Sequence, residues 1–228
     1  MLSAIILAAG AGRRLKASVP KPLVEIRGRP AIIYSLEPFN KHPDIDEIIL
    51  VTSAQNKAAI AKAIKSYSFK KIKALCLGGR RRQDSVYEGL KAVSPGSNWV
   101  IIHDSARPFI NSKLITKVIS AAKKTGAAIL GIPVKATIKS VQEDFLVDKT
   151  VDRGNLWEAQ TPQAFKKELI LKAYNKYFQE NFTDDASLVE KLGERVKIVQ
   201  GSYENIKITT RVDLLFAGLI AERGAHAI

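Results

Sequence analysis

The sequence predicts an α/β fold in which helices cover both faces of a doubly wound, mostly parallel sheet, with a β-hairpin arm protruding from it. The first observation is that short apolar runs alternate with helical patterns from residue 4 to residue 132. Such alternation is typical of parallel sheets. The second is that the rhythm stops at residue 133, after which polar and apolar side chains alternate. We therefore expect a single domain over residues 1–228, with the arm at about 134–157.

The first half of the chain supplies the predicted sheet and its helices. Apolar runs predict strands at Ala4–Ala8, Glu47–Thr52, Ile72–Leu77, Trp99–His103 and Ala127–Ile132. Helical patterns lie between them at Ala31–Phe39, Ala54–Ser66, Arg82–Ala92 and Leu114–Lys124, the last capped by Asn111 or Ser112 and ended by Gly126. Ligands of such sheets bind beyond the carboxyl ends of the strands. Residues 10–21, 78–85 and 104–108 are therefore expected to share one rim.

The second half begins with the arm. Residues 137–141 and 147–151 read as two extended runs, and the polar residues 142–144 lie between them. Because a lone two-stranded hairpin is marginal in water, we expect the arm to join two copies of the chain. The rest predicts a helix at Lys166–Phe178, a helix with Thr183 as its N-cap, strands at Val196–Val199 and Ile206–Thr209, and a closing helix at Val212–Glu222.

Composition narrows the class of partners. The 228 residues carry a formal charge of +14, which suggests polyanionic ligands, from phosphorylated metabolites to nucleic acid. A single cysteine, Cys76, excludes an internal disulfide and is expected to be a buried small hydrophobe. No run approaches the ~18 apolar residues of a membrane span. The first strand begins too close to Met1 to leave room for a signal peptide, so we expect a cytoplasmic protein.

The loop from Ala8 to Lys21 resembles a phosphate loop without matching either common type. Gly10 and Gly12 permit a tight turn and close approach of the backbone to a ligand. A dinucleotide fingerprint needs a third glycine where Leu15 stands, and a Walker loop needs Gly-Lys-Ser/Thr after its second glycine. The residues alone leave open whether its basic side chains bind a ligand or flank a solvated turn.

Two more motifs lie on the expected rim. Gly78-Gly79 begins a turn into a helix, which either presents backbone N–H groups and the Ser85 hydroxyl to a base or ribose, or is a plain turn. Asp104, at the end of an apolar strand, is suited to a ribose hydroxyl or a magnesium ion. The alternative is an ion pair with Arg107 that shapes the loop. His103 has no partners at metal-ligand spacing, and we interpret it as structural.

Seven motifs occur in order along nearly the whole chain: AAGAGRR with the later PK, GGRRRQDSV, HDSARP, TVDRGNLW, TPQAF, TDDAS and NIKIT. Together they resemble the 2-C-methyl-D-erythritol 4-phosphate cytidylyltransferases. The resemblance implies a Rossmann-like nucleotidyltransferase fold and a reaction of CTP with 2-C-methyl-D-erythritol 4-phosphate that releases pyrophosphate. It also implies a requirement for Mg²⁺ or another divalent cation, and a homodimer in which each arm completes the neighbour's site.

The resemblance assigns roles to residues that match the family's motifs. Arg14 and Lys21 match the pair on the triphosphate and transition state, and Arg153 and Lys207 match the pair that positions the methylerythritol phosphate. The expected CTP-binding residues are Ala8, Ala9, Gly10, Gly78, Gly79, Ser85, Asp104 and Ser105. The expected substrate-binding residues are Arg107, Thr137, Arg153, Thr161, Thr183 and Lys207. Asp104 is at most a weak metal ligand, since the metal is expected to be held mainly by the CTP phosphates.

Two alternative functions are compared with this one. Ser105 stands where the family usually has alanine, and a serine there resembles the ribitol-5-phosphate cytidylyltransferases; residues 150–157 and 183–187 instead follow the methylerythritol-phosphate pattern. A basic nucleic-acid-binding module would account for the charge of +14, but it predicts clustered cations with interleaved aromatics. Aromatic residues are only 7% and the cations are scattered, so we expect no nucleic-acid partner.

Overall fold

A computed structural model describes residues 1–10 and 19–225 of the chain. Its elements in order are β1 (Leu2–Ala8), η2 (Lys21–Leu23), β2 (Glu25–Ile26), β3 (Arg29–Pro30), α1 (Ala31–Lys41), β4 (Glu47–Thr52), η3 (Ala54–Asn56), α2 (Lys57–Lys65), β5 (Ile72–Leu77), α3 (Arg82–Ala92), β6 (Trp99–Asp104), α4 (Ser112–Thr125), β7 (Ala127–Pro133), β8 (Ile138–Val141), β9 (Val147–Val151), β10 (Trp157–Lys166), α5 (Lys167–Tyr177), α6 (Asp185–Lys191), β11 (Lys197–Gln200) and α7 (Arg211–Ala225).

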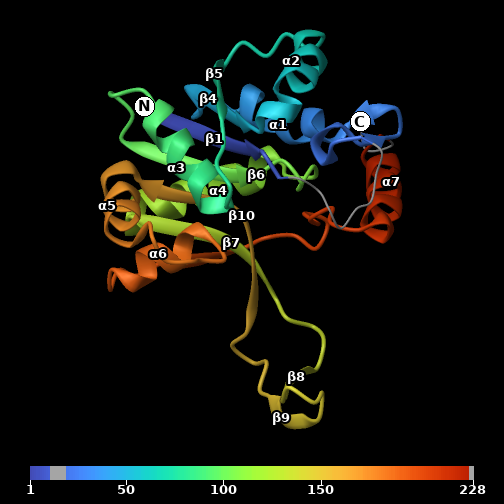
Figure 1. Cartoon of the computed structure of the whole chain (residues 1–228), viewed down its shortest axis with the longest axis vertical. Coiled ribbons are helices and arrows are strands. Elements are labelled where there is room, and N and C mark those ends of the chain that lie inside the picture. Colours follow the sequence, from blue (N-terminus) through green and yellow to red (C-terminus); the bar gives the residue numbers. More distant parts are fainter. Residues whose placement is uncertain (11–18, 226–228) are drawn as a thin grey trace.

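A seven-stranded sheet in the order β11-β7-β10-β6-β1-β4-β5 forms the body of the molecule (Figure 1). The pairs β1–β4, β1–β6, β4–β5 and β7–β11 are parallel, whereas β10 runs antiparallel to both of its neighbours. This confirms the predicted mostly parallel, doubly wound α/β sheet. The chain leaves β1 toward β4 on one side and has β6 on the other, so the strand order reverses between β1 and β6. Ligands of open α/β sheets bind at such a point.

Strand β1 shows why both faces of the sheet are covered. Its side chains alternate between two cores: Ala4 and Ile6 face one, and Ile5 and Leu7 face the other. Helices α1, α2 and α4 pack on the first face, and α3, α5 and α6 on the second. A third, smaller core lies under α7, where Ala217 is fully buried.

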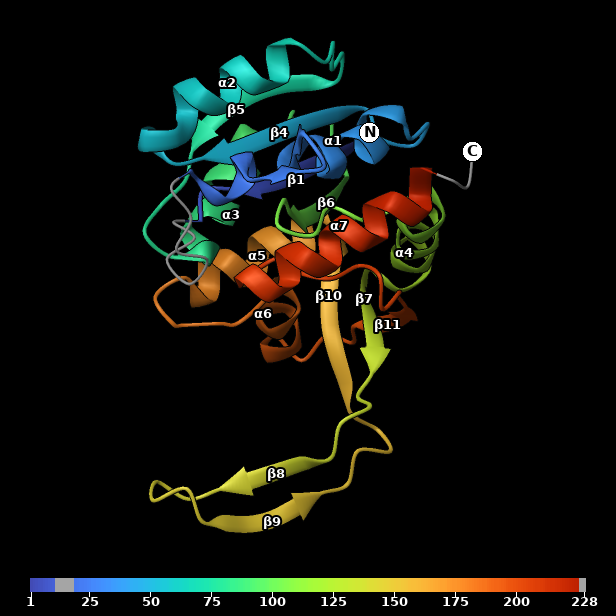
Figure 2. The same ribbon diagram turned by 90° about the vertical axis from the view of Figure 1, so that its right-hand side faces the viewer.

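The predicted arm forms as an antiparallel pair of β8 and β9, which hangs below the body on the extended ends of β7 and β10 (Figure 2). The backbone N–H of Val134 donates to the carbonyl of Leu156 where the arm leaves the sheet, at 3.0 Å. Phe145 and Leu146 at the tip of the arm are 84% and 64% exposed. The hairpin therefore makes its own backbone hydrogen bonds but buries little apolar surface within one chain.

Several sequence predictions need correction. The N-cap of α6 is Asp184, whose carboxylate accepts from the Ser187 N–H at 3.1 Å, and not Thr183 one residue earlier. Residues 206–209 are irregular rather than a strand: their alternation reflects Ile206 and Ile208 packing into the core under α7. Cys76 is half-buried because β5 is an edge strand of the sheet. Among the residues described, no helix is both long and apolar enough to cross a membrane.

Candidate functional site

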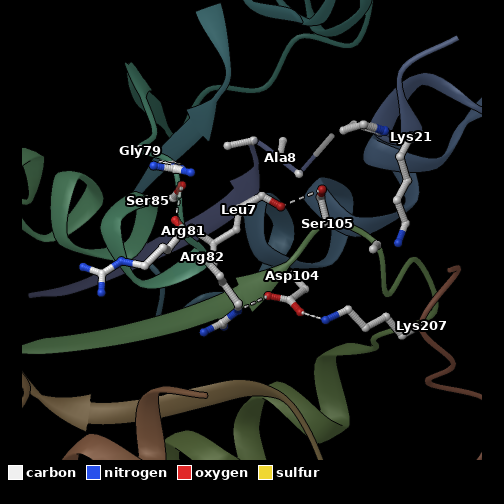
Figure 3. Close-up of a pocket in the computed structure, with 15 residues that line it drawn as sticks. Leu7, Ala8, Lys21, Gly79, Arg81, Arg82, Ser85, Asp104, Ser105 and Lys207 are labelled. Carbon is white, nitrogen blue, oxygen red and sulfur yellow. Dashed lines mark hydrogen bonds and ion pairs between the residues drawn. The ribbon is translucent and has the colours of Figure 1, made fainter. Parts of the chain in front are cut away.

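A pocket of about 410 Å³ lies at the carboxyl ends of β1 and β6, at the point where the strand order reverses (Figure 3). The three motifs predicted to share one rim do meet there. Its lining residues are Leu7, Ala8, Ala9, Gly10, Lys21, Pro22, Gly79, Arg80, Arg81, Arg82, Ser85, Asp104, Ser105, Ala106 and Lys207. The register explains this convergence, because Leu7 pairs with Asp104 and Ala8 pairs with Thr52 in neighbouring parallel strands.

Lys21 stands on the opposite side of the pocket from Gly79 and Ser85 (Figure 3). It opens the 3-10 turn η2, and Pro20 and Pro22 restrict the backbone on both sides of it. An ammonium group is thereby presented from a fixed piece of backbone. Arg14, the other cation predicted in this loop, lies outside the described residues.

The glycine-rich turn before α3 needs glycine at both positions. A Cβ atom on Gly78 would lie 2.4 Å from the Ser85 Oγ and 2.8 Å from the Ala9 Cβ. A Cβ on Gly79 would lie 2.3 Å from the Asp84 Cβ. Side chains at these positions would clash with the helix start and with the end of β1. The two glycines therefore let the turn approach β1 closely, and Gly79 and Ser85 line the pocket.

Asp104 carries the densest set of charge contacts in the pocket. Its Oδ1 accepts from the Arg82 Nε at 3.0 Å, and its Oδ2 accepts from the Lys207 Nζ at 2.6 Å. Burial opposes ionisation of this carboxyl, but the two cations outweigh burial and hold the pKa of Asp104 well below its usual range. Asp104 is therefore an anion at any physiological pH, with an ion pair on each oxygen.

Arg107 does not pair with Asp104. Among the described residues no ion pair joins the two, so the ion-pair alternative weighed from the sequence is wrong. The Arg107 guanidinium is buried and donates instead to the carbonyl oxygens of Asn205 and Ala159, at 2.7 and 3.3 Å. Arg107 thus ties the loop after β6 to the irregular segment that carries Lys207. Its predicted contact with substrate stays a prediction.

His103 and Thr161 form a buried hydrogen-bonded chain behind Asp104. The Asp104 N–H donates to the Thr161 Oγ1 at 3.1 Å, and the His103 Nδ1 lies 3.1 Å from the same oxygen. The His103 Nε2 is 3.1 Å from the Arg107 carbonyl, which only accepts, so the proton sits on Nε2 and Thr161 donates to Nδ1. Burial lowers the pKa of His103 to about 4. The neutral ring agrees with the structural role expected of His103.

Ser105 is held from the side of β1. Its hydroxyl donates to the Leu7 carbonyl at 2.7 Å and its N–H donates to the same oxygen at 3.0 Å. Two hydrogen bonds therefore connect the end of β6 to the end of β1 beside the pocket. The Ser105 side chain thus has a structural role that does not depend on the choice of substrate.

Of the six predicted substrate-binding residues, only Lys207 lines the pocket within one chain. Arg107 and Thr161 are buried beside the Asp104 backbone, and the other three lie away from the pocket. Arg153 and Thr137 are exposed on the arm, where Arg153 donates to the Lys135 carbonyl. Thr183 is exposed just before α6. The predicted pair of Arg153 and Lys207 is therefore separated in a single copy: Lys207 lines the pocket (Figure 3), whereas Arg153 follows β9 on the arm.

Sequence reasoning missed three connected residues, of which Arg82 lines the pocket and Asp185 and Tyr174 are buried behind it. Arg82 pairs with Asp104 and also lies 2.9 Å from Asp185, whose other oxygen accepts from the Tyr174 hydroxyl at 2.6 Å. Arg82 is the last of three consecutive arginines, and that run by itself indicates only a basic turn. Asp185 and Tyr174 lie about a hundred residues further along, so only the tertiary fold reveals their connection.

The site offers few protein ligands for a metal. Among the described residues that line the pocket, Asp104 is the only acidic one. No group of three or more His, Cys, Asp or Glu side chains suited to a metal ion occurs in residues 1–10 and 19–225. A divalent cation bound here would need oxygen ligands from a substrate, since each Asp104 oxygen already meets a cation.

Comparisons with known proteins agree on one family. Residues 2–223 match the family model described as IspD, 2-C-methyl-D-erythritol 4-phosphate cytidylyltransferase. A protein of that name from Shouchella clausii is 46% identical over 223 residues, 97% of this chain and 96% of the relative. Another relative of that name, from Syntrophus aciditrophicus, is 45% identical over 217 residues, which are 94% of this chain and 93% of the relative. The crystal structure of 4-diphosphocytidyl-2C-methyl-D-erythritol synthase from Anaerococcus prevotii superposes with a TM-score of 0.86 at 39% identity, covering 97% of this chain and 96% of that one.

Proposed function

The chain belongs to the 2-C-methyl-D-erythritol 4-phosphate cytidylyltransferase family, and from this premise we propose that it transfers the cytidylyl group of CTP to 2-C-methyl-D-erythritol 4-phosphate. The products are 4-diphosphocytidyl-2-C-methyl-D-erythritol and pyrophosphate, in isoprenoid precursor biosynthesis. The single observation that carries the proposal is a pocket with a glycine-rich turn on one side and the cations Lys21 and Lys207 on the other. The ribitol-5-phosphate alternative is not favoured, because the curated relatives named above carry the methylerythritol-phosphate name.

The reaction needs positioning and charge more than it needs a base. An oxygen of the methylerythritol phosphate, already ionised at neutral pH, attacks the α-phosphorus of CTP. The new oxygen–phosphorus bond forms as the bond to the β-phosphate oxygen breaks, and pyrophosphate leaves with that electron pair. Fixed cations lower the repulsion between the two anions and stabilise the charge that builds up. Lys21 and Arg14 are proposed to serve the triphosphate, and Lys207 and Arg153 the alcohol's phosphate.

We assign the two substrates to two sides of the pocket. Ala8, Ala9, Gly10, Gly78, Gly79 and Ser85 are proposed to bind cytidine through backbone groups and one hydroxyl. Asp104 and Ser105 lie between the two sides, where they can meet the ribose. Mg²⁺ is the proposed cofactor, and when bound it would neutralise phosphate charge; the CTP phosphates would hold it, with Asp104 at most a weak ligand. A cytoplasmic location is likewise proposed.

We also propose that the protein acts as a homodimer. Arg153 and Thr137 are matched to substrate-binding positions but lie on the arm, away from the pocket of their own chain. The arm exposes an apolar tip, and α7 exposes an apolar stripe of four residues at helical spacing. The stripe consists of Val212, Leu215, Phe216 and Leu219, which are 57%, 72%, 55% and 59% exposed. Two such exposed apolar surfaces support burial against a second copy.

The test is pyrophosphate release from CTP with a panel of alditol phosphates. With Mg²⁺ present, we expect release with 2-C-methyl-D-erythritol 4-phosphate and far less with ribitol 5-phosphate or with no acceptor. Parallel assays with ATP, GTP and UTP examine the choice of nucleotide. Comparable release with ribitol 5-phosphate, or none with methylerythritol phosphate, contradicts the proposal.

A further inference from the structure

The Arg82 guanidinium lies between two carboxylates on different elements (Figure 3 shows the contact with Asp104). Its Nε donates to the Asp104 Oδ1 at 3.0 Å, and its Nη1 lies 2.9 Å from the Asp185 Oδ2. Asp185 is fully buried in the first turn of α6, and the Tyr174 hydroxyl donates to its Oδ1 at 2.6 Å. One end of Arg82 is therefore anchored in the core, and the other end faces the pocket.

This divided contact leaves one oxygen of Asp104 for Lys207. A guanidinium beside a carboxylate commonly makes two parallel hydrogen bonds and occupies both oxygens. Arg82 makes a single contact with Asp104 instead, and its Nη2 is a buried nitrogen without a hydrogen-bond partner among the described residues. An unpaired buried N–H is costly, so other interactions must hold the side chain in this pose. Asp185 is the group that does so.

We propose that Asp185 is a positioning residue for the reaction. Its ion pair with the Arg82 Nη1 prevents the guanidinium from binding both oxygens of Asp104. The Asp104 Oδ2 therefore stays available to hold the Lys207 ammonium. Tyr174 supports Asp185 from behind. This inference rests on the proposed function, in which Lys207 positions the phosphate of the acceptor alcohol, and it adds residues that touch neither substrate.

The electrostatics of Asp185 indicate that it orients Arg82 rather than stabilises the folded protein. Burial raises the pKa of Asp185 even beside Arg82, which marks the ionised carboxyl as costly at this position. A buried ion pair is weak evidence of stability, because desolvation can cancel its attraction. What Asp185 does supply is a second ion pair, which divides the guanidinium between two carboxylates.

The first experiment compares Asp185→Asn with a matched control, Glu47→Gln. Glu47 is also a buried carboxylate with an ion pair, to Lys73 at 3.3 Å, but it lies at the start of β4, away from the pocket. Both substitutions remove one buried charge of the same kind. We expect Asp185→Asn to lower kcat/KM for the alcohol phosphate at least about tenfold, mainly through KM. Glu47→Gln should leave kcat/KM within about twofold even where it lowers the melting temperature.

A double-mutant cycle separates positioning from general damage. If Asp185 acts through Arg82, adding Asp185→Asn to an Arg82→Gln variant should change kcat/KM by less than about twofold, because the residue it orients is already gone. If the fold losses in kcat/KM of the two single variants multiply in the double variant, the proposal is overturned. A loss in Asp185→Asn no larger than that in Glu47→Gln overturns it as well.

A readout without catalysis keeps the inference separate from the proposed function. The protein is treated with an amine-reactive reagent, and the rate at which Lys207 becomes labelled is followed by peptide mass spectrometry. Lys117, which is exposed on α4, serves as the reference. Release of Lys207 from Asp104 in Asp185→Asn should raise its labelling rate relative to Lys117 at least about threefold, with no such rise in Glu47→Gln. An unchanged ratio overturns the inference. If the unmodified protein shows no cytidylyl transfer, the proposed function fails while the labelling ratio still decides this point.

Discussion

Asp104 is the residue on which the described charges of the pocket converge, and its neighbours illustrate what a sequence can and cannot predict. The acid at the end of an apolar strand was predictable, because the strand pattern places it on the ligand-binding rim. Its partners were not. Arg82 and Lys207 lie 22 residues before and 103 residues after it in sequence. Such ion pairs depend on how α3 and the segment before α7 pack, which no local pattern encodes.

At the same scale, Lys21 is expected to serve chemistry more than affinity. Lys21→Ala should lower kcat by about a hundredfold or more while CTP affinity changes less, because loss of one preorganised charge typically costs ~2.7–4 kcal/mol of transition-state stabilisation. Lys117→Ala on the exposed face of α4 is the control and should leave kcat unchanged. Steady-state kinetics and calorimetric CTP titration measure the two effects. Normal kcat with weakened CTP binding would make Lys21 a binding contact only.

His103 predicts a loss of stability in mild acid. Its pKa is about 4 when folded, against an ordinary 6.5, so below pH 6.5 the unfolded chain takes up a proton that the folded protein does not. The free energy of unfolding should therefore fall as pH drops from 6.5 toward 4, by about 2 kcal/mol between pH 7 and pH 5 from this residue. Buried His42, whose pKa burial also lowers, adds in the same direction.

Urea unfolding at several pH values measures that loss, and an NMR titration of the histidine rings assigns it. The His103 ring should stay neutral down to about pH 4. A ring that titrates near 6.5 in the folded protein contradicts the lowered pKa of His103.

Whole elements were predicted well where one periodicity dominates. Strands β4 and β5 and helix α3 have the predicted bounds, because each is a clean apolar run or an amphipathic repeat. Strand β10 was missed for a physical reason. Its buried residues include Gln160, Thr161 and Gln163, which bond to Asn205, His103 and Asp184 respectively. Polar residues satisfied in this way break the apolar pattern, and Pro162 argues against a central strand.

The arm is the element whose removal tests the proposed assembly. Joining Val134 to Leu156 through a short Asn-Gly turn uses a backbone hydrogen bond already present between them. The product should fold, since the sheet has cores of its own on both faces, but it should be inactive because Arg153 and Thr137 are gone. Sedimentation should show a monomer, and a truncated protein that still forms dimers would exclude the arm as the main contact.

In the whole molecule, the charge of +14 and the two exposed apolar surfaces both agree with a site that is shared between two copies. Cations line a pocket at the carboxyl edge of the sheet, and the arm carries further cations away from the pocket of its own chain. A single chain brings Lys21, Asp104 and Lys207 together but leaves Arg153 outside. We therefore expect that a complete site is assembled from two copies of the chain.

Mixing two inactive variants tests whether each site is shared between two copies of the chain. Lys21→Ala damages the pocket, and Arg153→Ala damages the arm. When subunits exchange at equal concentrations, about half of the dimers are mixed, and each mixed dimer has one site spared both lesions. Cytidylyl transfer should then recover to about a quarter of the unmodified rate, while each variant alone stays near its own low rate. If mixed dimers form, as shown by differently tagged subunits, and no activity returns, each site is built from one chain and the account is wrong.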